Sequence, residues 1–237
     1  MTIKIAGICI GINPVNNGWD VFCKDYIVDE EPDFIVESTE KDIAEEQKHI
    51  AEYTGRVKFI PLEVEKLWIQ RQIAEKIPTY DAFFIHATSV RVDEDAYLFL
   101  GPSGAGKSTH SRLWKRHFGD RLKVINDDKP IIKVKEDEIL ACGSPWSGKE
   151  GLRNNISAPV RGCIYIHQAK RNSIESMSAK ESWELIMRQA YRTQSAGNMK
   201  KTFKLFDKMI KTVPFYSLNC NKTYDAVELA YTKLQMK

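Results

Sequence analysis

The most constraining feature of the sequence is the stretch GPSGAGKST at residues 101–109. It matches the phosphate-binding pattern G-x-x-x-x-G-K-[S/T] at every fixed position. The apolar residues YLFL precede it directly, and a helix-like segment follows it. Glycines let backbone N–H groups approach phosphate oxygens, and a helix that starts there adds the positive end of its dipole. The sequence therefore predicts a strand, a phosphate-binding loop and a helix in succession.

The chemistry of this loop assigns roles to its residues. Lys107 is expected to reach the β- and γ-phosphates of a nucleotide, and the Ser108 hydroxyl is expected to bind Mg²⁺. The residues expected to surround the nucleotide are Gly101, Ser103, Gly104, Ala105, Gly106, Lys107, Ser108 and Thr109. The alternative is a glycine-rich turn with an incidental lysine. ATP or another nucleoside triphosphate, with Mg²⁺, is the predicted cofactor pair.

Strand-like and helix-like segments alternate along the chain, which indicates a mixed α/β protein. Helices are expected at 40–53 (with Thr39 as N-cap and Asp42 three residues on), at 62–77, from 107 onward, at 178–191 (with a Ser178/Glu181 capping box) and at 223–234. Strands are expected at 3–12, 34–36, 82–87, 97–100, 122–126, 130–134, 162–166 and 214–218. We expect residues 1–80 to form a small N-terminal α+β subdomain. It would pack on a nucleotide-binding core of residues 81–237 that contains a mixed sheet.

Composition narrows the function classes. Lys plus Arg is 35 and Asp plus Glu is 32, which gives a net charge of +3 and no reason to expect a nucleic acid or a membrane as partner. No apolar run approaches the roughly 18 residues of a membrane helix. The apolar stretch 3–12 lacks a cleavage site and is a strand candidate rather than a signal peptide. The five cysteines form no C-x-x-C pair, so a reducing cytoplasm is the expected compartment.

Two carboxylates, Asp127 and Asp128, follow the strand expected at 122–126. An acidic residue at a strand end beside a phosphate-binding loop can bind the metal of the nucleotide. The second carboxylate is then available for acid–base work. The stretch Asp-Asp-Lys-Pro is also good turn chemistry, so a solvated turn is the alternative.

Two further elements are candidates for the same site. His86 ends the apolar stretch 82–87, where a lone histidine is most often a buried core residue. The stretch GSPWSGKEG at 143–151 has the glycines and proline of a loop. Lys149 and Arg153 are available there to bind a phosphate or an acidic substrate, and the alternative is a flexible surface loop.

These motifs together resemble a known family. The stretches FIHATSVRVDEDAYLFLGPSGAGKSTHSRLW (84–114) and VINDDKPII (124–132) resemble the catalytic core of HPr kinase/phosphorylases and of ATP-dependent phosphoenolpyruvate carboxykinases. In both groups a histidine, the phosphate-binding loop and paired aspartates occur in this order. The stretches GSPWSGKEGLRNNISAPVRGCIYI (143–166) and CNKTYDAVELAY (220–231) are similar to uncharacterised bacterial HPr-kinase-like proteins. The resemblance extends from about residue 80 to the C-terminus.

The resemblance implies the phosphoenolpyruvate-carboxykinase/HPr-kinase-like fold and a Mg²⁺- and ATP-dependent kinase. Its acceptor would be a hydroxyl, either of a serine in a small protein or peptide or of a metabolite, and the chain would form a homo-oligomer. The implied roles are Asp127 as general base, Ser108 and Asp128 as metal ligands, and Lys107 on the phosphates. His86 would tune the acidic pair or contact the acceptor, and we expect its side chain to contact Asp127.

The sequence also departs from these families. Neither the glycine-rich signature that follows the HPr kinase core nor the oxaloacetate-binding arginine region of the carboxykinases is evident. Because these signatures are not evident, we expect phosphoryl transfer to a hydroxyl rather than decarboxylation. The alternatives are a carboxykinase-like phosphotransferase that acts on a small carboxylic acid, and a nucleotide-dependent switch with little turnover.

Overall fold

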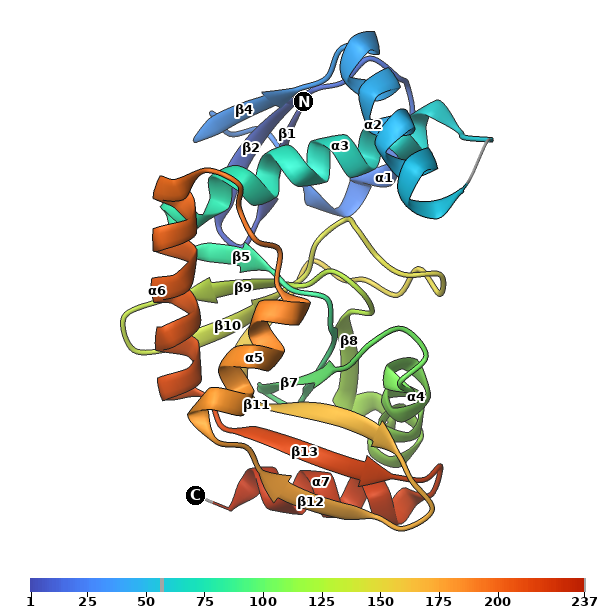
Figure 1. Cartoon of the computed structure of the whole chain (residues 1–237), viewed down its shortest axis with the longest axis vertical. Helices are drawn as coiled ribbons and strands as arrows, with labels where there is room; N and C mark the ends of the chain where they lie inside the picture. Colours follow the sequence, from blue (N-terminus) through green and yellow to red (C-terminus); the bar gives the residue numbers. More distant parts are fainter. Residues whose placement is uncertain (56–57, 237) are drawn as a thin grey trace.

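The computed structural model describes residues 1–55 and 58–236 as a mixed α/β protein with two β-sheets (Figure 1). A four-stranded sheet of order β3-β1-β2-β4 lies at one end of the molecule. A nine-stranded sheet has the order β5-β9-β10-β11-β7-β6-β8, with β13 paired to β11 and β12 paired to β13.

The elements have the following bounds. The strands are β1 (Thr2–Ile5), β2 (Ile8–Asn13), β3 (Ile27–Val28), β4 (Phe34–Glu37), β5 (Ala82–Phe84), β6 (Thr88–Val92), β7 (Asp95–Leu100), β8 (Leu122–Asn126), β9 (Ile131–Val134), β10 (Ile139–Cys142), β11 (Ser157–Gln168), β12 (Ser173–Ser176) and β13 (Phe215–Cys220). The helices are α1 (Trp19–Phe22), α2 (Glu40–Thr54), α3 (Pro61–Lys76), α4 (Lys107–Phe118), α5 (Ala179–Gln189), α6 (Ala196–Thr212) and α7 (Tyr224–Gln235). Short 3-10 turns cover Lys24–Tyr26, Ile77–Tyr80 and Gly119–Arg121.

The single strand predicted at 3–12 is wrong, because the chain reverses in its middle. Ala6 and Gly7 have positive φ angles of 51° and 75°, and Ile5 lies opposite Ile8 in an antiparallel pair. Positive φ at both central residues is the geometry of a two-residue hairpin turn. Apolar residues continue on both sides of this turn, so the hydrophobic pattern did not reveal it.

The predicted helix caps at Thr39 and Ser178 are confirmed. Thr39 and Asp42 form a reciprocal capping box at the start of α2, and Ser178 and Glu181 form another at the start of α5. In each box the cap hydroxyl accepts the backbone N–H of the third helical residue, and that residue's carboxylate accepts the cap N–H. These local contacts fix where both helices begin.

One hydrophobic cluster spans the two sheets. It contains Ile3 and Ile10 of the small sheet, Ile73 of α3, and Phe84 and Trp146 from later in the chain. The helix α3 therefore buries one face against residues on both sides of position 80. The division into residues 1–80 and 81–237 stays a prediction, and the two segments share this core.

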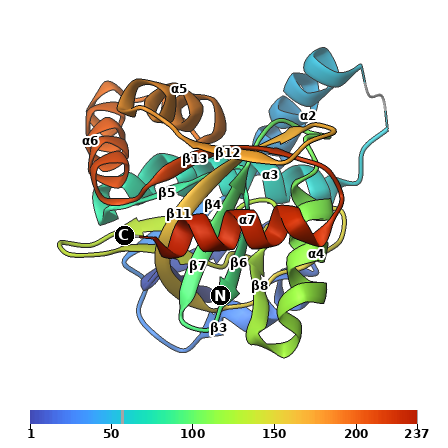
Figure 2. The same cartoon turned by 90° about the horizontal axis from the view of Figure 1, so that it is seen from below.

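Helices cover both faces of the large sheet. Along β7, Tyr97 and Phe99 belong to the cluster that contains α4 and α7, whereas Leu98 and Leu100 belong to the cluster that contains α5 and α6. Figure 2 shows these two helix pairs on opposite sides of the strands. Successive strand residues point to opposite faces, and burial of both faces explains why this stretch is apolar without alternation.

The strand directions bring several chain ends to one edge of the sheet. β7 runs parallel to β11, and β6 is antiparallel to both β7 and β8. The carboxyl ends of β7, β8 and β11 and the start of β6 therefore lie at the same edge. In open α/β sheets this is the edge at which ligands bind.

The strand predicted at 82–87 differs from the structure in extent and position. β5 ends at Phe84 and pairs with β9, so it does not lie beside β7. The neighbours of β7 are β11 and β6. β6 was not predicted from the sequence, although Val90 and Val92 alternate with polar residues there. His86 therefore lies in the connection that carries the chain from β5 to β6.

Two further expectations concern cysteines and membrane spans. All five cysteines are free and buried. Within residues 1–55 and 58–236, no helix combines the length and the apolar character that crossing a membrane requires.

His110 shows how burial affects a titratable group in this core. It lies in the first turn of α4 with 2% of its surface exposed, and its Nε2 accepts a hydrogen bond of 2.9 Å from Trp114 Nε1. Burial lowers the pKa of His110 from 6.5 to about 4. The folded protein therefore keeps this imidazole neutral at a pH at which the unfolded chain is protonated.

The stability of the protein should consequently fall between pH 6.5 and pH 4. The contribution of His110 is complete above pH 6.5 and is lost as the pH falls, because only the unfolded chain then takes up the proton. The expected loss is about 3 kcal/mol at pH 4. Urea denaturation at several pH values measures it. His110→Gln should show a flatter pH dependence than the wild type, whereas His49→Gln, at an exposed position, should not. Equal slopes for the wild type and His110→Gln would contradict this account.

Candidate active site

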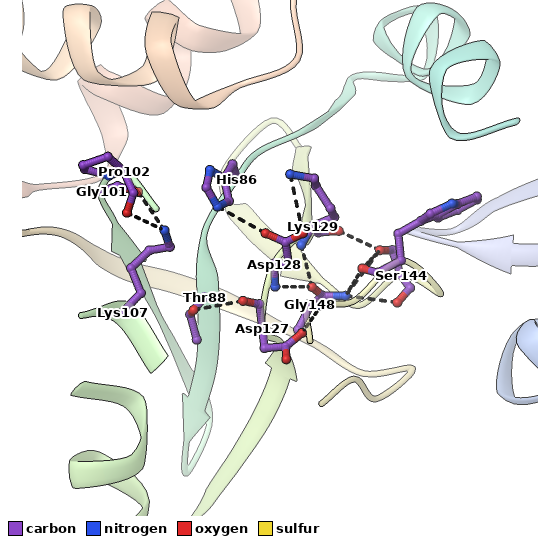
Figure 3. Close-up of polar contacts among 12 residues, drawn as sticks. His86, Thr88, Gly101, Pro102, Lys107, Asp127, Asp128, Lys129, Ser144 and Gly148 are labelled. Carbon is purple, nitrogen blue, oxygen red and sulfur yellow. Dashed lines mark hydrogen bonds and ion pairs between the residues drawn. The ribbon is translucent and has the colours of Figure 1, made fainter. Parts of the chain in front are cut away.

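A cavity of about 510 Å³ lies at the edge of the sheet where β7, β8 and β11 end. The phosphate-binding loop and the first turns of α4 line one side, and His86, Asp127 and Asp128 line another. Gly148, Lys149 and Glu150 from the loop 143–151 complete the wall, together with Gln168, Asn221 and Lys222. Figure 3 shows the polar contacts that connect the loop and the acidic pair to their surroundings.

The phosphate-binding loop has the backbone that its glycines allow. Gly101, Gly104 and Gly106 have φ angles of 143°, 81° and 105°. A Cβ at Gly101 would lie 2.9 Å from the Cβ of Ala105, so a side chain does not fit there. Gly106 caps α4 without a side chain, which leaves the N–H groups of the first helical turn available to an anion.

Lys107 is buried inside this loop, with 8% of its surface exposed. Its Nζ donates hydrogen bonds to the carbonyl oxygens of Gly101, at 2.7 Å, and Pro102, at 3.2 Å (Figure 3). Burial lowers the pKa of Lys107, and the negative charge of Asp128 opposes that shift. The ammonium group is thus held within the loop by carbonyl oxygens.

Asn126 organises the acidic pair, and the sequence analysis gave it no role. Its side chain is fully buried. Its Oδ1 accepts the backbone N–H groups of Asp128, at 2.9 Å, and Lys129, at 2.7 Å. Its Nδ2 donates to the carbonyl oxygens of Ser144, at 3.0 Å, and Trp146, at 2.9 Å. Asparagine before a turn is a recognised signal for such contacts with the following backbone.

The carboxylate of Asp127 holds the loop 143–151. Its Oδ1 accepts the N–H of Gly148 at 2.6 Å, and its Oδ2 accepts the N–H of Leu152 at 3.3 Å. The Thr88 hydroxyl donates to the Asp127 carbonyl oxygen at 3.0 Å, which ties the pair to β6. Burial raises the pKa of Asp127 above its ordinary value, although both N–H groups act in the opposite direction.

Asp128 has the opposite environment. His86 Nε2 lies 3.2 Å from its Oδ1, and Lys129 Nζ lies 3.6 Å from its Oδ2. Burial alone would raise the pKa of Asp128, but the hydrogen bond from His86 and the positive charges nearby outweigh it and lower the pKa. The two adjacent carboxylates therefore titrate in different ranges.

The expected contact between His86 and Asp127 is wrong, because His86 pairs with Asp128 (Figure 3). The turn that Asn126 stabilises separates the two carboxylates, so that Asp127 is directed to the loop 143–151 and Asp128 to His86. The order of residues along the sequence gave no way to choose between the two partners.

The loop 143–151 does fold back over the phosphate-binding loop. Lys149 and Glu150 line the cavity, and Glu150 Oε1 lies 3.1 Å from Arg112 Nη2 on α4. Lys149 thus lines the same cavity as Lys107, and its role in substrate binding stays a prediction.

Arg153 differs from Lys149 and does not line this cavity. Its guanidinium donates to Ser147 Oγ at 3.0 Å and to the Phe22 carbonyl oxygen at 3.2 Å, and it lies over the Phe22 ring. It connects the loop to α1, so its position gives no support to the predicted role in substrate binding.

Several polar residues that line the cavity were not predicted from the sequence, among them Arg112, Gln168, Asn221 and Lys222. Gln168 ends β11, and Asn221 and Lys222 follow β13, which is parallel to β11. Parallel strands end at the same edge, so these positions become visible once the strand pairing is known. Gln168 also holds the phosphate-binding loop, since its Nε2 donates to the Gly104 carbonyl oxygen at 2.7 Å.

Replacement of Asn126 tests whether its amide organises the site. Asn126→Asp keeps the shape but directs a buried carboxylate at two carbonyl oxygens, so the free energy of unfolding should fall by about 3 kcal/mol. Urea denaturation measures this change. The same substitution at the exposed Asn219 is the control and should cost less than about 1 kcal/mol. Similar losses for the two variants would show that the Asn126 contacts are not special.

Comparisons with known proteins give a distant structural likeness and no match at the level of sequence families. No protein-family model matches the sequence, and no curated protein matches it. Among solved structures, the chain is similar to the HPr(Ser) kinase/phosphatase from Coxiella burnetii, with 13% sequence identity and a TM-score of 0.36. The similar region covers 63% of this chain and 95% of that one. A likeness of this size does not establish a shared family, so the activity is inferred from the residues of the site.

Proposed function

We propose that this protein is a Mg²⁺- and ATP-dependent kinase with an HPr-kinase-like core, which transfers the γ-phosphoryl group to a hydroxyl of a serine or metabolite. One observation carries the proposal. The cavity beside the phosphate-binding loop contains two adjacent carboxylates whose pKa values are shifted in opposite directions. In such a pair, the carboxylate with the raised pKa can accept a proton, while the carboxylate with the lowered pKa stays ionised.

The residues of the phosphate-binding loop fit a nucleoside triphosphate. The positive φ angles of three glycines and the open N-terminus of α4 provide backbone N–H groups for phosphate oxygens. In this proposal Lys107 moves its hydrogen bonds from the Gly101 and Pro102 carbonyls to the β- and γ-phosphates. A cavity of about 510 Å³ lies within the usual range for small-molecule and cofactor sites.

Ser108 and Asp128 would hold the Mg²⁺ ion. Both line the cavity, and the lowered pKa of Asp128 keeps its carboxylate ionised for this purpose. Protein-bound Mg²⁺ commonly has one or two carboxylate ligands and completes its shell with phosphates and water. When bound, the ion would neutralise charge on the phosphates. His86 would orient Asp128 through their 3.2 Å contact.

Asp127 would be the general base. The raised pKa of Asp127 makes it a stronger proton acceptor than an ordinary aspartate. In the transfer the acceptor oxygen forms a bond to the γ-phosphorus, the bond from that phosphorus to the ADP oxygen breaks, and the hydroxyl proton passes to Asp127. Lys149 at the rim would attract the anionic reactants. Assembly into a homo-oligomer remains part of the same prediction.

Removal of the Lys107 charge tests the nucleotide site. Lys107→Met keeps a long apolar stem in the buried position, so the fold should persist. The affinity for Mg-ATP should fall about tenfold or more, because the charge-assisted contacts to the phosphates are lost, and ADP formation should stop. Calorimetric titration with Mg-ATP and Mg-GTP, together with an ADP assay, measures both effects.

The matched control is Lys123→Met, at an exposed position of β8. This variant should bind and turn over nucleotide as the wild type does. Unchanged affinity and turnover in Lys107→Met would refute the assignment of the phosphate-binding loop.

The two aspartates should respond differently to the same substitution. Asp127→Asn should leave Mg-ATP affinity within about twofold of the wild type, while phosphoryl transfer, assayed as ADP formation, falls about 10² to 10⁴-fold. Asp128→Asn should weaken Mg²⁺-dependent nucleotide binding about tenfold or more, because a neutral amide is a poorer ligand for Mg²⁺ than a carboxylate.

Titration calorimetry with and without Mg²⁺ separates the two effects. Asp137→Asn, at an exposed position in the β9–β10 turn, should change neither quantity. Identical behaviour of Asp127→Asn and Asp128→Asn would overturn the division of roles between them.

A further inference from the structure

A second cavity, of about 470 Å³, adjoins the nucleotide cavity and shares His86 with it. Its walls come from α3, from the end of β5 and from the chain that connects α5 to α6. Nothing in the proposed nucleotide site uses this space. Because a single side chain lies on both walls, a molecule bound here would lie next to the acidic pair.

The second cavity is lined by cations and by no carboxylate. Arg71, Lys129 and Arg192 line it, and none of its lining residues is an aspartate or a glutamate. Arg71 is paired with the buried Glu46 at 3.2 Å, and Lys129 lies 3.6 Å from Asp128. Arg192 is exposed and has no hydrogen bond or ion pair to any residue of 1–55 or 58–236. Its charge is therefore available to a bound anion.

The segment that carries Arg192 is fixed at both of its ends. On one side, His86 N–H donates to the Gln189 carbonyl oxygen at 2.8 Å, and Tyr191 N–H donates to the Phe84 carbonyl oxygen at 2.9 Å. On the other side, the N–H groups of Gln194 and Ser195 each donate to the Glu75 carboxylate at 2.9 Å. These contacts hold the backbone around Arg192 in place before any ligand binds, which reduces the entropy cost of binding.

Gln189 connects this wall to the phosphate-binding loop. With its amide oriented to satisfy both neighbours, the side-chain nitrogen lies 3.2 Å from the Gly101 carbonyl oxygen and 3.0 Å from that of His86. The start of the phosphate-binding loop and the start of the Arg192 segment are thus joined through one side chain. This contact places the second cavity beside the start of the phosphate-binding loop.

We propose that the second cavity binds the acceptor, and that the acceptor carries an anionic group, a carboxylate or a phosphate, which Arg192 binds. This inference rests on the proposed function, and the phosphoryl transfer is the one described there. The cavity size suits a small molecule. The anion would fix one end of the acceptor at Arg192, while its hydroxyl lies toward His86 and the acidic pair. The substrate class is therefore a small acidic hydroxy compound.

Binding of simple anions tests the subsite without knowledge of the acceptor. Succinate, its neutral analogue succinamide and inorganic phosphate are titrated into the isotope-labelled full-length protein, with the nucleotide site saturated by a Mg²⁺ complex of non-hydrolysable ATP. Backbone amide shifts locate the binding site. Succinate or phosphate should shift the amides of residues 189–194 in a saturable way, and succinamide should not. The anion that binds identifies the acceptor's group as carboxylate or phosphate.

Arg192→Gln should weaken this binding about fivefold, the upper range for one exposed ion pair, and Arg192→Lys should restore part of it. Arg188→Gln is the matched control, because Arg188 is paired with Glu184 on the exposed side of α5 and does not line the cavity. Binding of neither anion at 189–194, equal binding of succinamide, or unchanged affinity in Arg192→Gln would each overturn the proposal.

Replacement of Mg²⁺ by Mn²⁺ tests whether the bound anion lies at the acceptor position. The paramagnetic ion should accelerate the relaxation of the succinate protons, or of the phosphate nucleus if phosphate is the anion that binds. Binding without this enhancement would overturn the acceptor role. The nucleotide titration on the same samples distinguishes the two hypotheses. If nucleotide binds and anions do not, only the acceptor subsite fails, whereas anion binding without nucleotide binding removes the kinase proposal.

Discussion

The buried amide of Asn126 is the contact on which the geometry of the site depends. Its oxygen fixes the turn that contains Asp128, and its nitrogen fixes the start of the loop 143–151 through Ser144 and Trp146. Asp127, between these two regions, holds the same loop through Gly148. A single side chain at the end of β8 therefore sets the separation of the two carboxylates and the position of the loop that closes the cavity. Neither carboxylate would have a defined partner without it.

That separation has an electrostatic consequence. Asp128 faces His86 and Lys129, and the charge of Lys107 also acts on it, so this carboxylate remains ionised. The Asp127 carboxylate accepts the backbone N–H groups of Gly148 and Leu152, and burial raises its pKa. Two residues of the same type, adjacent in sequence, thus have pKa values shifted in opposite directions by what surrounds them, which is what the proposed roles of metal ligand and proton acceptor require. The division does not require any difference in their covalent structure.

The sequence predicted the parts of this site that depend on local chemistry. The phosphate-binding loop, the caps at Thr39 and Ser178 and the helix that begins at Lys107 all follow from contacts within a few residues. The contact of His86 with Asp128 and the contact of Arg153 with Phe22 could not be predicted, because both depend on pairing between distant segments. β5 pairs with β9 rather than with the strand of the phosphate-binding loop, and Arg153 reaches Phe22 of α1. No local pattern encodes either contact, and the strand order could not be obtained from one sequence.

The two cavities are lined largely by different segments of the chain. The nucleotide cavity is built from the loop 101–106, the start of α4 and the turn after β8, and its geometry is dictated by phosphate chemistry. The second cavity takes Gln70 and Arg71 from α3 and the segment 189–194 from the connection between α5 and α6. On our proposal, a change at Arg71 or Arg192 would alter which acceptor is recognised, whereas a change at Gln189 would also affect the phosphate-binding loop at Gly101. The shared His86 then couples recognition to chemistry, because the side chain that borders the acceptor is the same one that orients Asp128. If the second cavity binds the acceptor, the N-terminal segment would contribute to substrate binding through α3, and the hydrophobic core that it shares with β5, β9 and β10 holds α3 in place.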